Sequence, residues 1–302
     1  MKKRILALGL TVALAAASLV ACGGASTKTT EKATEAAAEQ GSEKATEAAK
    51  EEKADAGELR TYKLGVNGSD HEEWEKANEL LAKDNIKLEM VEFSDYVKPN
   101  EALEDGEIDL NAFQTEIYFN NFVKERGYTD LGILAYTQVA PMGIYSSKYK
   151  SLDEATGHLI IAIPNDVTNG GRALKFLEKN GFLTLKKEAG LTPTVMDIEK
   201  YNKDVEIVEM VATQIPASLP DLSFACINNG VAKDAGLTLK NDAIVYEDYK
   251  EPDMKNYWNI IAAKKDRIES EDFQKIKKAY NSDEVKQVVL EHYDGQSIPV
   301  WD

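Results

Sequence analysis

The stretch IPNDVTNGGRAL, residues 163–174, decides how the chain around it folds. It continues an apolar run, LIIAIP at 159–164, which is typical of a buried strand. Asn165, Gly170 and Gly171 then predict a tight polar turn, and we expect a helix from Arg172 onward. Such a strand, turn and helix predict an anion site. Free backbone N–H groups and the helix dipole favour negative charge there, and glycines let a ligand approach the backbone.

Arg172 adds its own chemistry to this predicted site. Its planar guanidinium matches a carboxylate in bidentate fashion. The alternative is an ordinary strand-to-helix turn with Arg172 on the surface, and a single glycine turn does not decide between the two interpretations. The decision depends on the rest of the chain.

The N-terminus has the pattern of a bacterial lipoprotein signal. A basic start, MKKR, precedes an apolar run at 5–20 that is short for a membrane span. The sequence LVAC at 19–22 predicts that residues 1–21 are removed and that Cys22 is lipidated, although ordinary cleavage leaving a free thiol is the alternative. We therefore expect a protein anchored by lipid to the extracytoplasmic face of the cell membrane.

Residues 22–60 are predicted to form a disordered tether. The motif EKATEAA occurs twice, and the stretch from residue 23 contains no Val, Ile, Phe, Tyr or Trp. Such a segment cannot bury enough apolar surface to offset its ordering entropy.

Composition narrows the class of protein. The net charge of −16 becomes −19 once the three basic residues of the signal are removed, which argues against nucleic acid as a partner. No cluster of His, Asp or Glu has the spacing of a metal site, and no nucleophile has a base or turn motif beside it. We therefore predict no metal, no cofactor and no catalytic residue. Cys226, in an apolar run, is expected to be a small buried residue.

Beyond the tether, apolar alternation and amphipathic segments follow one another along the chain, which predicts an α/β fold with largely parallel, covered sheets. One expected strand covers residues 108–114. The chain breaks at APMG, 140–143, and begins a second αβ series. We expect two lobes joined by two hinge crossings: residues 61–138 plus 248–302 form lobe 1, and residues 139–247 form lobe 2. Ligand would sit in the cleft between them.

Many separated motifs resemble the NlpA/MetQ family of methionine-binding lipoproteins, which deliver ligand to an ABC importer. In chain order they are GVNGSDHEE, VEFSDYVKPN, NAFQ, APMGIYS, IPNDVTNGGRALKFLEK, IPASLPD, CINN, YWNII, AYNSDEVK and GQSIPVWD. The resemblance runs over residues 62–301 and implies a two-lobed, type II periplasmic-binding-protein-like fold.

The resemblance also implies polar ligand residues. Arg172 would hold an α-carboxylate, and Asn169 would add a hydrogen bond. Asn228 and Asn259 match family asparagines whose amide oxygens suit an α-ammonium group, which only donates. Without the resemblance, both asparagines are equally compatible with capping a turn or a strand end.

Three aromatic residues, Tyr96, Phe113 and Tyr118, match the family's pocket around the thioether, although they are also compatible with a role as core aromatics. One departure is Thr115, which replaces a histidine common in the family. This exchange removes a ring and supplies a small hydroxyl, so ligands other than methionine stay open, whereas the residues that would hold the α-carboxylate and the α-ammonium are unchanged.

We therefore expect a solute-binding protein, not an enzyme, that captures an amino acid, with L-methionine as the first expectation. Its partners would be the permease and ATPase subunits of an ABC transporter, and the protein would be a monomer. Alternative ligands are D-methionine, a methionine-containing dipeptide or another amino acid. Alternatives from another class are a cell-surface enzyme or a surface interaction protein.

Overall fold

The structure is a computed structural model that describes residues 57–301. The predicted signal peptide, Cys22 and nearly all of the predicted tether lie outside the described residues. Within the part that is described, no helix is long and apolar enough to cross a membrane.

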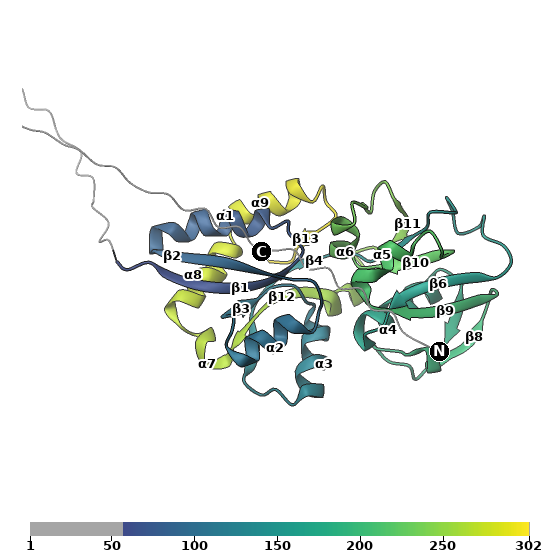
Figure 1. The fold of residues 1–302 in the computed structure, drawn as a ribbon, viewed down its shortest axis with the longest axis horizontal. Coiled ribbons are helices and arrows are strands. Elements are labelled where there is room, and N and C mark those ends of the chain that lie inside the picture. The colour runs from purple at the N-terminus through teal and green to yellow at the C-terminus, as the bar shows by residue number, and fades with distance from the viewer. Residues whose placement is uncertain (1–56, 302) are drawn as a thin grey trace, which may run out of the picture. The chain divides into compact units, whose positions relative to one another are not determined.

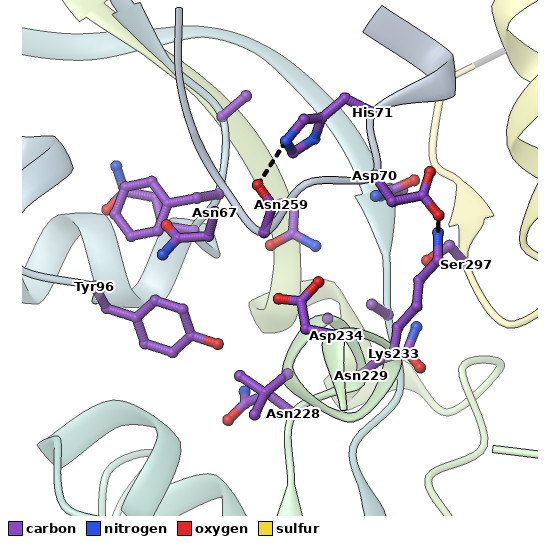
Figure 2. A pocket seen from close by; sticks show the side chains of 18 of the residues that line it. Asn67, Asp70, His71, Tyr96, Asn228, Asn229, Lys233, Asp234, Asn259 and Ser297 are labelled. Carbon is purple, nitrogen blue, oxygen red and sulfur yellow. Dashed lines mark hydrogen bonds and ion pairs between the residues drawn. The ribbon is translucent and has the colours of Figure 1, made fainter. Parts of the chain in front are cut away.

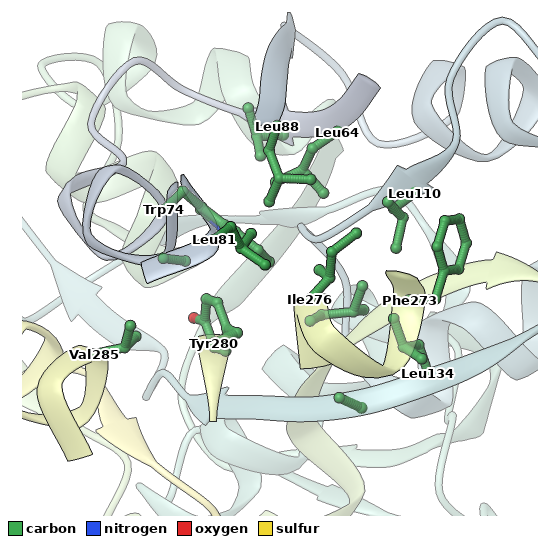
Figure 3. Packing of buried hydrophobic residues seen from close by; sticks show 14 of the residues in the cluster. Leu64, Trp74, Leu81, Leu88, Leu110, Leu134, Phe273, Ile276, Tyr280 and Val285 are labelled. Carbon is green, nitrogen blue, oxygen red and sulfur yellow. The ribbon is translucent and has the colours of Figure 1, made fainter. Parts of the chain in front are cut away.

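One six-stranded sheet has the strand order β13-β4-β12-β3-β1-β2. Its strands are β1 (Arg60–Asn67), β2 (Ile86–Phe93), β3 (Leu110–Asn111), β4 (Leu131–Val139), β12 (Trp258–Lys264) and β13 (Ile298–Pro299). Apolar side chains of α1 (Glu72–Leu81), α8 (Glu271–Tyr280) and α9 (Asp283–His292) cover one face. The core on this face includes Trp74 and Tyr280, whose ring centroids lie 4.3 Å apart (Figure 3). The opposite face is covered by α2 (Lys98–Asp105) and α3 (Glu116–Arg126).

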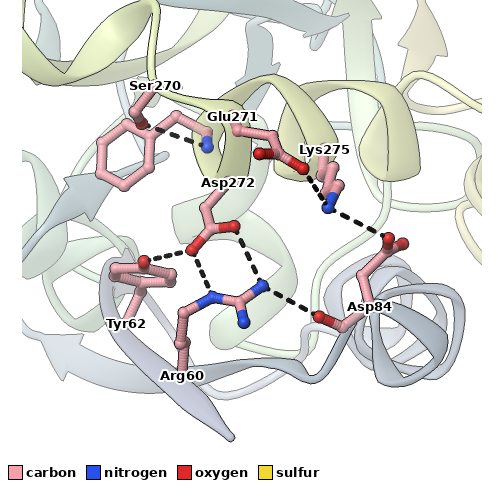
Figure 4. Close-up of polar contacts among 8 residues, drawn as sticks. Arg60, Tyr62, Asp84, Ser270, Glu271, Asp272 and Lys275 are labelled. Carbon is pink, nitrogen blue, oxygen red and sulfur yellow. Dashed lines mark hydrogen bonds and ion pairs between the residues drawn. The ribbon is translucent and has the colours of Figure 1, made fainter. Parts of the chain in front are cut away.

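The start of this sheet is fastened by a polar cluster (Figure 4). Arg60, the first residue of β1, donates to both carboxylate oxygens of Asp272 at 2.6 and 3.1 Å, and the Tyr62 hydroxyl donates to Asp272 at 2.6 Å. Hydrogen bonding to Arg60 lowers the pKa of the Asp272 carboxyl. These contacts tie the first residues of β1 to α8.

A second, five-stranded sheet has the order β11-β5-β10-β6-β9. Its strands are β5 (Gly143–Tyr145), β6 (Leu159–Pro164), β9 (Val205–Met210), β10 (Phe224–Ile227) and β11 (Ala243–Tyr246). Helix α4 (Val167–Lys179) packs on one face, and α5 (Ile215–Ser218) and α6 (Asn229–Asp234) pack on the other. Cys226 of β10 is fully buried, as expected, and burial raises the pKa of its thiol.

The chain crosses between the two sheets twice, so each sheet forms the centre of one lobe (Figure 1). It leaves the first sheet after β4, at residues 140–142, and returns between β11 and β12 through residues 247–257, which include the 3-10 helix η4 (Pro252–Tyr257). Boundaries at 138/139 and 247/248 remain a prediction.

Strand direction differs from the expectation of largely parallel sheets. In the first sheet only the pairs of β1 with β2 and with β3 are parallel, whereas β12 runs antiparallel to both of its neighbours. In the second sheet β5 is antiparallel to β10 and β11. The two strands that enter a lobe through a crossing, β5 and β12, start on the cleft side, where the parallel strands end, so they run antiparallel to their neighbours.

Two local elements also differ from the sequence prediction. The strand expected at 108–114 pairs only over Leu110–Asn111, because the following residues turn away toward the cleft. A two-stranded hairpin, β7 (Leu183–Leu185) with β8 (Ile198–Tyr201), was not predicted.

Candidate functional site

A cavity of about 620 Å³ lies between the two lobes (Figure 2). Its lining includes residues at or just after the carboxyl ends of β1, β2, β3 and β10. All eight residues predicted as ligand contacts are among those that line it: Tyr96, Phe113, Thr115, Tyr118, Asn169, Arg172, Asn228 and Asn259. The volume suits a small molecule.

Arg172 lies in the first turns of α4 and is 3% exposed. Its Nε donates to both carboxylate oxygens of Glu247 at 3.0 Å, and its Nη2 donates to Glu247 and, at 2.9 Å, to the carbonyl oxygen of Ala140. The guanidinium carbon also lies 4.3 Å from the centroid of the Tyr257 ring. One edge of the fork is therefore occupied by the protein itself. Nη1 has no acceptor among the residues that the structure describes, and this nitrogen remains for a ligand.

Glu247 was not among the predicted site residues. The structure instead buries it to 9% exposure, with its carboxylate also accepting from the backbone N–H of Met142 at 2.7 Å. The backbone N–H of Glu247 donates in turn to the carbonyl of Met142 at 3.0 Å. Both hinge crossings therefore meet at the Arg172–Glu247 ion pair, which ties them to α4.

The helix that was predicted from Arg172 onward begins five residues earlier, and a side chain of the protein itself caps its N-terminus. Helix α4 begins at Val167, and the side chain of Asp166 caps it by accepting from the backbone N–H of Asn169 at 2.8 Å. The Asp166 carboxyl group thus already occupies the helix N-terminus, and burial raises the pKa of this group. The glycines serve packing: a Cβ on Gly170 or Gly171 would lie 2.7 or 2.8 Å from neighbouring backbone atoms.

Three residues that line the cavity have a buried side-chain amide oxygen without a partner in the described chain. Asn228 precedes α6, but its side chain does not cap the helix. Its Nδ2 donates to Oδ1 of Asn169 at 2.8 Å, and its Oδ1 is buried with no partner in the described chain. The side-chain oxygens of Asn67 and Gln138, which also line the cavity, are in the same state. Leaving a buried acceptor unpaired costs roughly 1–3 kcal/mol, so these oxygens suit a ligand that donates hydrogen bonds.

The three predicted aromatic residues form a triangle at the cavity. Their ring centroids are 6.0 Å apart for Tyr96 and Phe113 and 6.2 Å apart for the two pairs that include Tyr118. The Tyr118 hydroxyl donates to the carbonyl of Tyr96 at 2.9 Å, which fixes the two residues relative to each other. Burial raises the pKa of both tyrosines, so both phenols stay neutral at physiological pH. Figure 2 shows the Tyr96 ring reaching into the cavity on the side of Asn228.

Thr115 contributes to the fold as well as to the cavity. It caps α3, its Oγ1 accepting from the backbone N–H of Tyr118 at 3.3 Å. It also forms an isolated antiparallel bridge with Asn259, which places the two residues side by side at the cavity wall. The hydroxyl oxygen is thus engaged by the helix, while its proton remains free to donate.

Residues 62–301 match the family of NlpA lipoproteins. The chain belongs to this family. Over 243 residues it is 40% identical to the D-methionine-binding lipoprotein MetQ of Escherichia coli, with 79% of this chain and 88% of that protein covered. A nutrient-binding protein from Burkholderia cenocepacia, solved bound to methionine, is 35% identical with a TM-score of 0.75, covering 80% of this chain and all of the other. The substrate-binding protein of a methionine transporter from Streptococcus pneumoniae is 38% identical with a TM-score of 0.75, covering 80% and 96%.

These similarities confirm the predicted family and the two-lobed, periplasmic-binding-protein-like fold of this NlpA lipoprotein. They also confirm the prediction that it is a binding protein and not an enzyme, since the family consists of substrate-binding proteins.

A network of buried side-chain amides, which was not predicted, fixes the position of Phe113 and Thr115 in this NlpA lipoprotein. Gln114, between them, donates to Oδ1 of Asn100 at 2.7 Å and to Oδ1 of Asn111 at 2.9 Å. Asn100 donates back to Gln114 at 2.7 Å. All three amides are almost fully buried, so their hydrogen bonds hold the loop after β3 rigidly against α2. The motif NAFQ carried this signal, but its partner Asn100 lies in a different element.

At its other end the cavity is lined by charged groups. Glu73 of α1 is 5% exposed, and its carboxylate accepts from the Tyr293 hydroxyl at 2.8 Å. Burial raises the pKa of Glu73. Within the described residues no group of His, Cys, Asp and Glu side chains is arranged to hold a metal ion.

Proposed function

We propose that this protein captures a free amino acid, methionine in the first place, and delivers it to the permease and ATPase subunits of an ABC importer. Its relatives support this proposal, since they include a D-methionine-binding lipoprotein, a protein solved bound to methionine and the substrate-binding protein of a methionine transporter. The single observation that carries the proposal is the cavity itself. An arginine nitrogen, an unpaired amide oxygen and a ring of three aromatics surround one space.

The polar ends of an amino acid are assigned to the second lobe and the returning strand. The α-carboxylate would accept from Nη1 of Arg172, the part of the guanidinium that Glu247 leaves open. The α-ammonium would donate to Oδ1 of Asn228, which has no other partner in the described chain, and to Asn259. Asn169 holds the Asn228 amide so that its oxygen faces the ligand.

The aromatic triangle of Tyr96, Phe113 and Tyr118 is assigned to the ligand side chain. A thioether gains about 0.3–1.5 kcal/mol from each aromatic ring it contacts, so three rings favour methionine over an aliphatic side chain of similar length. Binding would favour the closed arrangement because the triangle belongs to the first lobe while Arg172 and Asn228 belong to the second. A ligand shifts such an equilibrium only through contacts made in one state and not the other.

We further propose that Cys22 carries the lipid and that the segment from Cys22 to the start of β1 at Arg60 tethers the binding domain to the extracytoplasmic face of the cell membrane. The protein would act there as a monomer. Mass spectrometry of protein purified from membranes tests the anchor. The N-terminal peptide should begin at Cys22 with added acyl mass, and an unmodified Cys22 thiol would contradict it.

Calorimetric titration tests the ligand. The panel contains L-methionine, D-methionine, a methionine-containing dipeptide, leucine and glutamine. We expect L-methionine to bind tightest, and leucine to bind at least tenfold more weakly because it lacks the sulfur contacts. If no member of the panel binds more tightly than millimolar, the proposed function is wrong.

Two observations favour testing ligands other than L-methionine. The cavity of about 620 Å³ continues past the aromatic triangle to the charged end near Glu73, which leaves room for a second residue. Thr115 replaces a ring with a hydroxyl that can donate to a polar group. Tighter binding of D-methionine or of the dipeptide in the same titration would reassign the ligand without changing the transport role.

A further inference from the structure

A second set of contacts joins the lobes at the charged end of the cavity, apart from the residues assigned to the ligand. Lys233, in the last turn of α6, extends from the second lobe to the first. Its Nζ lies 2.7 Å from the Asp70 carboxylate and 3.8 Å from the centroid of the Tyr293 ring (Figure 2). His292, at the end of α9, places its Nε2 2.7 Å from the same carboxylate. Two groups from different lobes therefore share one carboxylate.

The Lys233–Asp70 ion pair is less exposed than an ordinary surface ion pair and has an aromatic ring beside it. Its side chain is 29% exposed and that of Asp70 is 36% exposed, and the ammonium also lies over an aromatic face. Burial opposes the charge on Asp70, but hydrogen bonds from Lys233 and His292 lower the pKa of this carboxyl. A second interlobe pair, Lys240 with Asp294 at 2.9 Å, is about two-thirds exposed on both sides. Exposed pairs of that kind contribute little.

Beside the ion pair, the loop after β1 and the end of α6 approach each other closely. Gly68 lies in the loop after β1 and has a φ of +78°. A Cβ at this position would lie 2.5 Å from a carboxylate oxygen of Asp234, the residue after Lys233. This contact exists only when α6 lies against the loop, so the ion pair marks the closed arrangement of the two lobes.

Helix α6 connects this contact to the ligand site. It follows directly on Asn228, the proposed ammonium contact, and carries Lys233 in its last turn. A helix of this length, about 9 Å, moves as one rigid piece. A ligand on Asn228 and the ion pair of Lys233 therefore bias the same element toward the same position.

We propose that Lys233 is a latch residue: it contacts no part of the amino acid, but stabilises the closed state and so sets how long ligand is retained. This inference rests on the proposed function for its ligand. Contacts made only in the closed state raise the fraction of protein that is closed, and the apparent affinity rises by the same factor. Loss of the latch should accelerate ligand release and leave the association rate nearly unchanged.

The test measures release of radiolabelled methionine from purified protein after a chase with excess unlabelled methionine. We expect Lys233→Met to release ligand about tenfold faster than wild type, from the loss of an ion pair and a cation–π contact. The matched control, Lys240→Met, removes the exposed interlobe pair and should stay within about twofold. Asp70→Asn keeps the cation–π contact, so it should release ligand faster than wild type but more slowly than Lys233→Met, and the double variant should match Lys233→Met. Equal release from Lys233→Met and Lys240→Met would overturn the latch.

A second measurement separates failure of the latch from failure of the proposed ligand. Small-angle X-ray scattering of protein without ligand reports the degree of opening directly. Lys233→Met should have a larger radius of gyration than wild type and Lys240→Met, and three equal values would refute the latch. If wild type fails to retain methionine but the scattering difference is present, the ligand assignment is wrong and the latch stands.

Discussion

The ion pair between Arg172 and Glu247 makes the proposed carboxylate site inseparable from the hinge, and substitution of Arg172 tests both roles. Arg172→Met removes the ligand donor and leaves the buried Glu247 carboxylate with the N–H of Met142 as its remaining close donor among these groups. Removing one member of a buried pair typically costs about 3–5 kcal/mol, because the other charge stays desolvated. For a domain of this size each kcal/mol lowers the Tm by roughly 2–4 °C, so we expect a fall of about 6–20 °C without ligand.

A double variant separates stability from binding. Arg172→Met combined with Glu247→Gln replaces both charged side chains, so no buried charge is left at the hinge. The amide oxygen of the new glutamine can still accept the hydrogen bond from the backbone N–H of Met142. We expect most of the lost stability to return, measured by urea unfolding without ligand. Methionine binding should not return. Truncating one partner of a buried charge pair weakens binding by about 2–5 kcal/mol, which is a factor of roughly 30 to several thousand in Kd.

Two results would refute this reasoning in different places. If the double variant binds methionine with the wild-type Kd, Arg172 does not hold the carboxylate and serves the hinge alone. If Arg172→Met is as stable as wild type, the Glu247 carboxylate is not buried against it in solution, and the hinge arrangement is wrong. Glu247→Gln alone serves as the control, since it keeps the Arg172 donors and should retain measurable binding.

Three further substitutions test packing, charge and positioning. Gly171→Ala should lower the free energy of unfolding by about 1–3 kcal/mol in urea, because the added Cβ would meet the backbone of a neighbouring segment. The control is Gly230→Ala, whose Cβ would point into open space and should change the free energy of unfolding by less than about 0.5 kcal/mol. Glu73→Gln should stabilise the protein by about 1 kcal/mol or more at pH 8 and not at pH 4: burial raises the folded-state pKa of Glu73, so its ionisation costs stability as pH rises through that value. Equal effects at both pH values would contradict this. Gln114→Leu should leave Nδ2 of Asn100 and Oδ1 of Asn111 without their partner, and we expect it to cost about 1–3 kcal/mol and to weaken methionine binding through the loop after β3. Unchanged affinity in calorimetry would show that the network supports the fold only.

The secondary structure was largely predictable because its causes are local. The apolar run LIIAIP forms the strand that its composition predicts, β6. Strand direction was not predictable in this way. Periodicity carries no information on which end of a sheet a strand enters, and the crossings between lobes decide that.

The residues of the candidate site were also only partly predictable. The resemblance to a known family named eight residues, and all eight are among those that line the cavity. Glu247 could not be found, because it lies 75 residues from Arg172 and looks like any surface acid until the two crossings bring it inside. The glycines after Asn169 were misread for a related reason: a glycine that frees a turn and a glycine that lets two segments touch are identical in sequence. Local preference therefore settled which elements and side chains this protein has. Only the tertiary structure decided which charges meet and which are left free for a ligand, because those pairings form between segments that the chain brings together from far apart.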